Sequence, residues 1–225
     1  MRRLFAPILA LLAVPMLLGA TAPTRDWTRT VSRNPAGAYV IGNPAAPIKL
    51  VEWASYTCPH CAAFARESQA TLTDRWIRNG EVSLELRHLV RDSADLAAAV
   101  VARCTGARGV FATSAAIYAG QDKWLDRAVQ FQQGNASRIG MYPPLARLRA
   151  IADASGLSDI GRAHELTDAR LDACFADQAE IDRVVGMAAA AQGVQGTPTF
   201  FVAGQRLDGF TWDKVEPLLR ARGAH

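Results

Sequence analysis

Two cysteines separated by two residues, at the point where a strand pattern gives way to a helix pattern, constrain the fold of this chain most strongly. The strand pattern is the β-rich run of residues 48–53, which follows Pro47. From Cys61 onwards, apolar residues recur at helical spacing as far as residues 79–80, which predicts an amphipathic helix of about five turns. The sequence Cys58-Pro59-His60-Cys61 therefore lies in a strand-to-helix turn.

This position gives the four residues different chemistry. The first turn of a helix has unpaired N–H groups and a partial positive charge, and both stabilise a thiolate. Cys58 is the predicted nucleophile, whereas Cys61 faces inward one turn later and is placed to resolve a mixed disulfide. Pro59 suits the first helical position, where its missing N–H is not needed. His60 adds a donor and, when protonated, a charge that favours the Cys58 thiolate. The motif predicts thiol–disulfide exchange, with the Cys58–Cys61 disulfide as redox group and no separate cofactor.

Metal binding is the competing interpretation of this cysteine pair. A structural zinc site needs four ligands, usually two close pairs, and the chain has one close pair. Cys104 and Cys174 are isolated, and the histidines show no ligand spacing. We therefore expect no metal site, with a copper(I)-binding module as an alternative from a different functional class.

Strand and helix patterns alternate along the rest of the chain. The strand patterns cover residues 38–41, 82–86 and 199–202, with a hairpin partner at 205–207. Helical periodicity extends from 93 to 193, except over the polar residues 130–142, where we expect a loop; a last helix follows Thr211. The sequence predicts an α/β fold in which residues 38–92 and 194–225 form one domain around an all-helical insertion, residues 93–193.

A second motif, Gly196-Thr197-Pro198-Thr199, directly precedes the strand at 199–202. An X-Pro bond at a strand start can be cis. A cis bond before Pro198 would turn the backbone of Thr197 toward the cysteines and leave its N–H and C=O free to pair with an extended substrate chain. The alternative is a trans proline that simply opens the strand.

Together these features resemble the DsbA-like family of bacterial thiol–disulfide oxidoreductases. The resemblance is carried by Glu52, the Cys-Pro-His-Cys motif, the helical insertion and the run 196–202 with Gly204. It implies a thioredoxin-like fold with a helical insertion, a cis-proline at Pro198, a periplasmic location and oxidation of incoming proteins. Thr197 stands where the best-known oxidase of the family has valine, and is similar to the residue in isomerase-type relatives.

The N-terminus has the pattern of a secretory signal peptide. A positive head, residues 1–3, precedes an apolar run to Leu18 and small residues at positions 19–22, which predicts a signal peptide over 1–20 with cleavage near 20–22. A retained membrane anchor is the alternative, but the run is shorter than the ~20 residues that span a bilayer. We expect residues 21–37 to form a flexible arm. Removing two leader arginines lowers the net charge from +4 to +2, which argues against a nucleic-acid partner.

Export changes how the other two cysteines are interpreted, because disulfides persist in oxidising compartments. Cys104 and Cys174 each lie on an apolar helix face, so we predict a structural disulfide between them. Two separate buried thiols are the alternative.

Glu52 lies on the strand that leads to the motif, on the face of Leu50 and Ala54, and we predict a partly buried carboxylate beneath the site. Such a group has a raised pKa and can exchange protons with Cys61, whereas an exposed edge charge could not.

The favoured function is an exported dithiol oxidase that acts as a monomer on unfolded or reduced exported proteins, with a membrane-bound partner that resets its redox state. An isomerase or reductase on the same fold is the alternative. Such relatives carry an N-terminal dimerisation domain, for which the segment 21–37 leaves no room.

Overall fold

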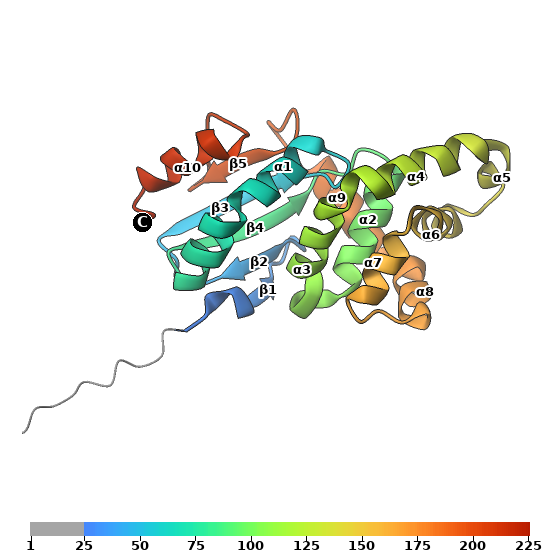
Figure 1. Ribbon diagram of the computed structural model, residues 1–225, viewed down its shortest axis with the longest axis horizontal. Helices are drawn as coiled ribbons and strands as arrows, with labels where there is room; N and C mark the ends of the chain where they lie inside the picture. Colours follow the sequence, from blue (N-terminus) through green and yellow to red (C-terminus); the bar gives the residue numbers. More distant parts are fainter. Residues whose placement is uncertain (1–24) are drawn as a thin grey trace, which may run out of the picture.

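The computed structural model describes residues 25–225, and the predicted signal peptide 1–20 lies outside the described residues. Its six strands form one sheet in the order β1-β2-β4-β3-β5-β6, in which β3 and β4 are parallel and the other neighbours are antiparallel (Figure 1). The strands are β1 Val31–Arg33, β2 Tyr39–Gly42, β3 Ile48–Ala54, β4 Val82–His88, β5 Thr199–Val202 and β6 Gln205–Arg206. The strand that leads to the cysteines is therefore central.

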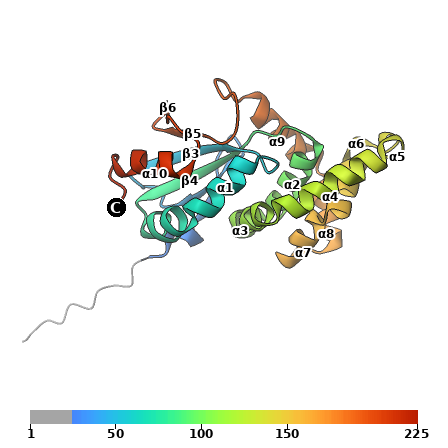
Figure 2. The ribbon, with the colours of Figure 1, turned by 45° about the horizontal axis from the view of Figure 1, so that its top comes forward.

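The helix after the cysteines packs on one face of this sheet. α1 Pro59–Ser68 continues into the π-helical segment η2 Gln69–Ile77, so the predicted five-turn helix is wound more loosely in its second half. Phe64 packs against Phe200 of β5 and Trp212 of α10 Trp212–Arg220. These rings belong to a core cluster that buries the β3 side chain Leu50. This shared core holds α1 against the sheet. Figure 2 shows α1 lying along one face of the strands.

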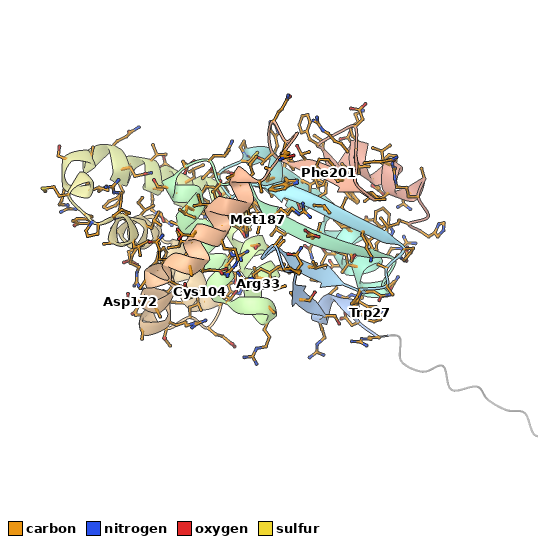
Figure 3. The ribbon with its side chains drawn as sticks, turned by 180° about the vertical axis from the view of Figure 1, so that it is seen from behind. Trp27, Arg33, Cys104, Asp172, Met187 and Phe201 are labelled. Carbon is orange, nitrogen blue, oxygen red and sulfur yellow. A yellow bond between two sulfur atoms is a disulfide. The ribbon has the colours of Figure 1, made fainter. Side chains whose placement is uncertain are left out.

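The helical block follows β4 and returns to the sheet before β5. Its helices are α2 Ser93–Cys104, α3 Gly106–Ala119, α4 Gln121–Gly134, α5 Ala136–Gly140, α6 Pro144–Ser155, α7 Leu157–Ala163, α8 Asp168–Ala176 and α9 Gln178–Ala189. α2 is buried on every side over residues 97–102, all alanine or valine, because small side chains allow the surrounding helices to approach closely. α9 crosses the opposite sheet face, where Met187 packs with Trp53 (Figure 3).

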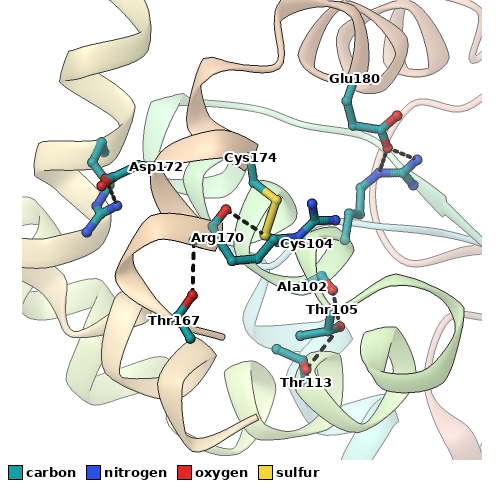
Figure 4. Close-up of a disulfide and its surroundings, with 11 residues drawn as sticks. Ala102, Cys104, Thr105, Thr113, Thr167, Arg170, Asp172, Cys174 and Glu180 are labelled. Atoms are coloured by element: carbon teal, nitrogen blue, oxygen red, sulfur yellow. Dashed lines mark hydrogen bonds and ion pairs between the residues drawn. A yellow bond between two sulfur atoms is a disulfide. The ribbon is translucent and has the colours of Figure 1, made fainter. Parts of the chain in front are cut away.

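A disulfide closes the block. Cys104 at the end of α2 is bonded to Cys174 of α8, two helices far apart in the chain (Figure 4). No helix within residues 25–225 has the length and apolar character needed to cross a bilayer.

Two segments differ from the sequence-based expectation. Residues 27–33, expected within a flexible arm, form a short 3-10 helix and β1, because β1 pairs with β2 and Arg33 forms an ion pair with Glu180 of α9. The segment 130–142, expected to be a loop, is largely helical, since α4 runs to Gly134 and α5 follows. A helical glycine is only about 1 kcal/mol less favourable than alanine, so neighbouring helix formers outweigh it.

Candidate active site

Cys58 begins α1 directly after the short turn that follows β3. It has the extended backbone of an N-cap residue, φ −89° and ψ 118°, and its carbonyl accepts hydrogen bonds from the N–H groups of Cys61 and Ala62, both at 3.2 Å. Pro59 occupies the first turn, where no N–H is required. The Cys58 thiol thus lies at the N-terminal end of a helix that has no side-chain cap of its own.

Hydrogen bonds to its sulfur lower the pKa of Cys58 to about 5. The Cys61 thiol makes the largest contribution to this lower pKa, and the backbone N–H groups of Cys61 and His60 add to it, while burial opposes them. As a thiol, Cys58 Sγ donates to the Thr197 carbonyl oxygen at 3.1 Å. The His60 side chain is exposed and its ring packs edge-on against Phe210, with centroids 5.2 Å apart. His60 therefore reaches Cys58 through its N–H, and an effect of its ring charge stays a prediction.

The pKa of Cys61 is shifted in the opposite direction. Its side chain is completely buried, and burial raises the pKa of Cys61 well above its ordinary value. The hydrogen bond to Cys58 and the nearby Glu52 carboxylate raise this pKa further. Both residues are buried, with 3% of Cys58 and 0% of Cys61 exposed, but at neutral pH Cys58 is a thiolate and Cys61 is a thiol.

Glu52 lies beneath the two sulfurs on β3, between Leu86 of β4 and Phe200 of β5 in the sheet register. Its side chain is buried, with 6% of the residue exposed. Burial, and to a smaller extent the Cys58 charge, raises the pKa of Glu52 to about 8. A carboxyl group with this pKa exists in both protonation states near neutral pH and can therefore give and take a proton there.

The loop before β5 completes the site. The Thr197–Pro198 peptide bond is cis, and the Thr197 hydroxyl is buried without a hydrogen-bond partner among the described residues. A groove of about 640 Å³ begins at this loop and passes His60 and Phe210. We call it the active-site groove; its polar rim includes Arg206, Asp208 and Lys214.

Sequence reasoning missed Gln121, the first residue of α4. Its buried amide Nε2 donates to the carbonyl oxygens of Tyr56 at 2.7 Å and Cys58 at 3.0 Å. A residue of the insertion therefore fixes the turn that carries Cys58, the predicted nucleophile. No local pattern marks Gln121, because its partners lie more than 60 positions earlier.

A second group from the insertion holds the same turn. Asp95 of α2 accepts hydrogen bonds from Ser55 Oγ at 2.5 Å and the Tyr56 N–H at 2.8 Å, and burial raises the pKa of Asp95 to about 6. Arg91 donates to the hydroxyls of Ser55 and Thr57, both at 3.0 Å. The side chains of Ser55 and Thr57 and the N–H of Tyr56 are thus held by α2 and by the residue two positions before it.

A family profile described as thioredoxin matches residues 34–221, most of the chain. The chain belongs to this thioredoxin family. A crystal structure described as a protein-disulfide isomerase from Novosphingobium aromaticivorans is similar at 30% identity and a TM-score of 0.74, over 81% of this chain and 95% of that one. Wolbachia pipientis α-DsbA1 shares the fold at 21% identity and a TM-score of 0.66, over 84% of this chain and 92% of that one. The predicted thioredoxin-like fold with a helical insertion, and the resemblance to DsbA-like proteins, are confirmed.

Among curated proteins, one of Rickettsia typhi that carries the name protein-disulfide oxidoreductase is 26% identical over 87% of this chain. The match covers 64% of the Rickettsia typhi protein and 61% of its counterpart in Rickettsia bellii, so the chain spans less than two thirds of these thioredoxin-family relatives.

The site offers few ligands to a metal. No three His, Cys, Asp or Glu side chains come together as ligands within residues 25–225. A copper(I) ion at the cysteine pair would therefore have two protein ligands, Cys58 and Cys61.

Proposed function

We propose that this protein is an exported thiol–disulfide oxidoreductase that acts as a dithiol oxidase. The observation that carries the proposal is the contrast between the two sulfurs, since the pKa of Cys58 is lowered to about 5 while the pKa of Cys61 is raised. Interactions that stabilise the Cys58 thiolate favour the reduced protein, and a disulfide whose reduced form is stabilised is a good oxidant.

The reaction consists of two exchanges. A substrate thiolate attacks Cys58 Sγ of the Cys58–Cys61 disulfide, the S–S bond breaks, and Cys61 leaves as a thiolate that takes up a proton. A second substrate thiolate then attacks the substrate sulfur of the mixed disulfide, and Cys58 leaves as a thiolate. The substrate loses two electrons and the cysteine pair gains them, so no other cofactor is required.

Glu52 is the proposed proton donor to Cys61. Burial raises the pKa of both groups, and the nearby Glu52 carboxylate raises the pKa of Cys61 further, which supports a proton transfer between them at neutral pH. When Cys61 is released as a thiolate in the first exchange, its negative charge is buried, and a buried charge without a proton donor or a counter-charge is strongly disfavoured.

The active-site groove is the proposed binding site for an extended segment of an unfolded or reduced exported protein. The Thr197 backbone at its head supports this role, because its carbonyl oxygen lies 3.1 Å from Cys58 Sγ. Phe210, 49% exposed, gives the groove an apolar contact without sequence specificity.

We further propose that the protein acts as a monomer in the periplasm and that a membrane-bound partner resets its redox state. The signal-peptide pattern of residues 1–20 supports export. Electron balance requires an oxidant for the cysteine pair, since each turnover leaves the pair reduced, and the proposed partner would supply it.

The test is oxidation of a reduced peptide with two cysteines by a stoichiometric amount of the oxidised protein. We expect one disulfide per Cys58–Cys61 pair, none with Cys58→Ser, and unchanged yield when Cys104 and Cys174 are both alanine. No oxidation by the unmodified protein would reject the proposal.

An isomerase is the second candidate. It is favoured by Thr197 before the cis-proline and by the likeness to the structure described as a protein-disulfide isomerase. The reduction potential separates the two, since about −120 mV is typical of a strong oxidant and about −180 mV of an isomerase.

A further inference from the structure

A second cavity, which shares no lining residue with the active-site groove, is bordered by Glu52. It has a volume of about 290 Å³ and lies between the sheet, the α1–η2 helix and α3, partly open to solvent. We call it the inner cavity; its apolar walls are formed by Val31, Phe64, Leu72, Leu84, Leu86 and Phe111. Its volume is close to the lower end of the range for small-molecule sites.

Three polar side chains that line the inner cavity lack a protein partner. Glu52, Ser68 and Tyr118 are buried, with 6%, 3% and 9% of each residue exposed. The side-chain oxygens of these three residues form no hydrogen bonds with any residue in the range 25–225. Buried polar groups in folded proteins are almost always hydrogen-bonded, so these three require partners from outside the chain.

The charge of Glu52 favours a cationic ligand in the inner cavity. Glu52 is the only acid among the described residues that line the cavity, and Arg108, the only base there, is exposed on the first turn of α3. Glu52 has no ion pair within the described part of the chain. An ionised buried carboxylate without a counter-charge is strongly disfavoured, and a cation inside the cavity would supply the missing charge.

We propose that the inner cavity binds a small organic cation, an ammonium group on an apolar body, with the ammonium paired to Glu52. An ammonium group has three donors and no acceptor, which suits the oxygens of Glu52, Tyr118 and Ser68. The apolar walls suit an aromatic or aliphatic body. This site goes beyond thiol–disulfide exchange, because binding requires neither cysteine to react.

Calorimetric titration of the oxidised protein with phenethylamine at pH 7 tests the proposal, with 2-phenylethanol as the matched neutral probe. The amine should bind roughly tenfold to hundredfold more tightly than the alcohol, the range for a charged hydrogen bond. Because the pKa of Glu52 is about 8, the carboxyl must lose its proton to form the pair. Titrations in two buffers of different ionisation enthalpy should therefore show release of about one proton per bound amine.

Two variants separate binding in the cavity from binding elsewhere. Glu52→Gln should weaken amine binding by about the same factor and abolish proton release. Ala115→Phe, at an exposed α3 position that lines the cavity, should block entry while leaving Glu52 in place. Ala119→Phe, one turn later and outside the cavity, is its control. Absence of amine binding, equal binding of the alcohol, or binding unaffected by either cavity variant would overturn the proposal.

Discussion

Reducing the Cys58–Cys61 disulfide should make the folded protein more stable. An unfolded thiol has a pKa of about 8.5, whereas the pKa of Cys58 in the folded protein is lowered to about 5. A depressed pKa stabilises the folded reduced state fully above pH 8.5, by about 4.8 kcal/mol, and the stabilisation disappears as the pH falls through 5. At pH 7 the shift corresponds to about 2.7 kcal/mol. The Cys58 thiolate is partly screened by solvent, which weakens the interactions that stabilise it, so we expect about 2 kcal/mol.

Thermal unfolding of the two redox forms measures this difference. Cys104 and Cys174 are first replaced by alanine, so that a reductant acts on the active-site pair alone. A difference of about 2 kcal/mol should raise the midpoint of the reduced form by about 4–8 °C at pH 7 for a chain of this size. At pH 5 the stabilisation falls to about 0.4 kcal/mol and the two midpoints should nearly coincide.

A Cys58→Ser variant in the same background is the control, since its midpoint should not respond to reductant. The reasoning fails if the oxidised form has the higher midpoint of thermal unfolding at pH 7, which would indicate that the disulfide is favoured over the dithiol, as in a reductase. It also fails if the gap is the same at pH 5 and pH 7, because a thiolate effect must follow the titration of the thiol.

Three further predictions concern residues around the site. Glu52→Gln should stabilise the protein by about 1–3 kcal/mol at pH 8 and by little at pH 5, measured by chemical denaturation at both pH values. The reason is that the raised pKa of Glu52 makes the stability of the unmodified protein fall as the pH rises from about 4.5 to 8. Gln121→Leu leaves the carbonyls of Tyr56 and Cys58 without this donor and should destabilise the protein by about 2–3 kcal/mol. It should also raise the pKa of the Cys58 thiol, measured by the pH dependence of alkylation. Gln133→Leu, at an exposed position on the same helix, should change neither the stability nor this pKa. Replacing both Cys104 and Cys174 by serine should remove about 4 kcal/mol of stability, given the 70-residue separation, and an accompanying change in thiol pKa would show that this disulfide also tunes the active site.

Local sequence patterns identified the elements of the site, because each pattern reflects interactions between near neighbours. A proline after a cysteine marks a helix start, and a proline before a β-rich run marks a strand start. Local patterns did not predict β1, because this strand is ordered by interactions outside its own segment. It pairs with β2, and its Arg33 forms an ion pair with the distant Glu180.

The sequence by itself identified the residues proposed to carry the chemistry, with Cys58 as the predicted nucleophile, Cys61 as the predicted resolving cysteine and Glu52 on the strand that leads to them. Only the tertiary structure decided the environment of those groups. The pKa of Glu52 depends on burial between β4 and β5, two strands that lie far apart in the chain, and the turn before Cys58 depends on Gln121 and Asp95 of the insertion. Desolvation and long-range hydrogen bonds are properties of packing, and no periodicity within one segment encodes which distant residue will provide them.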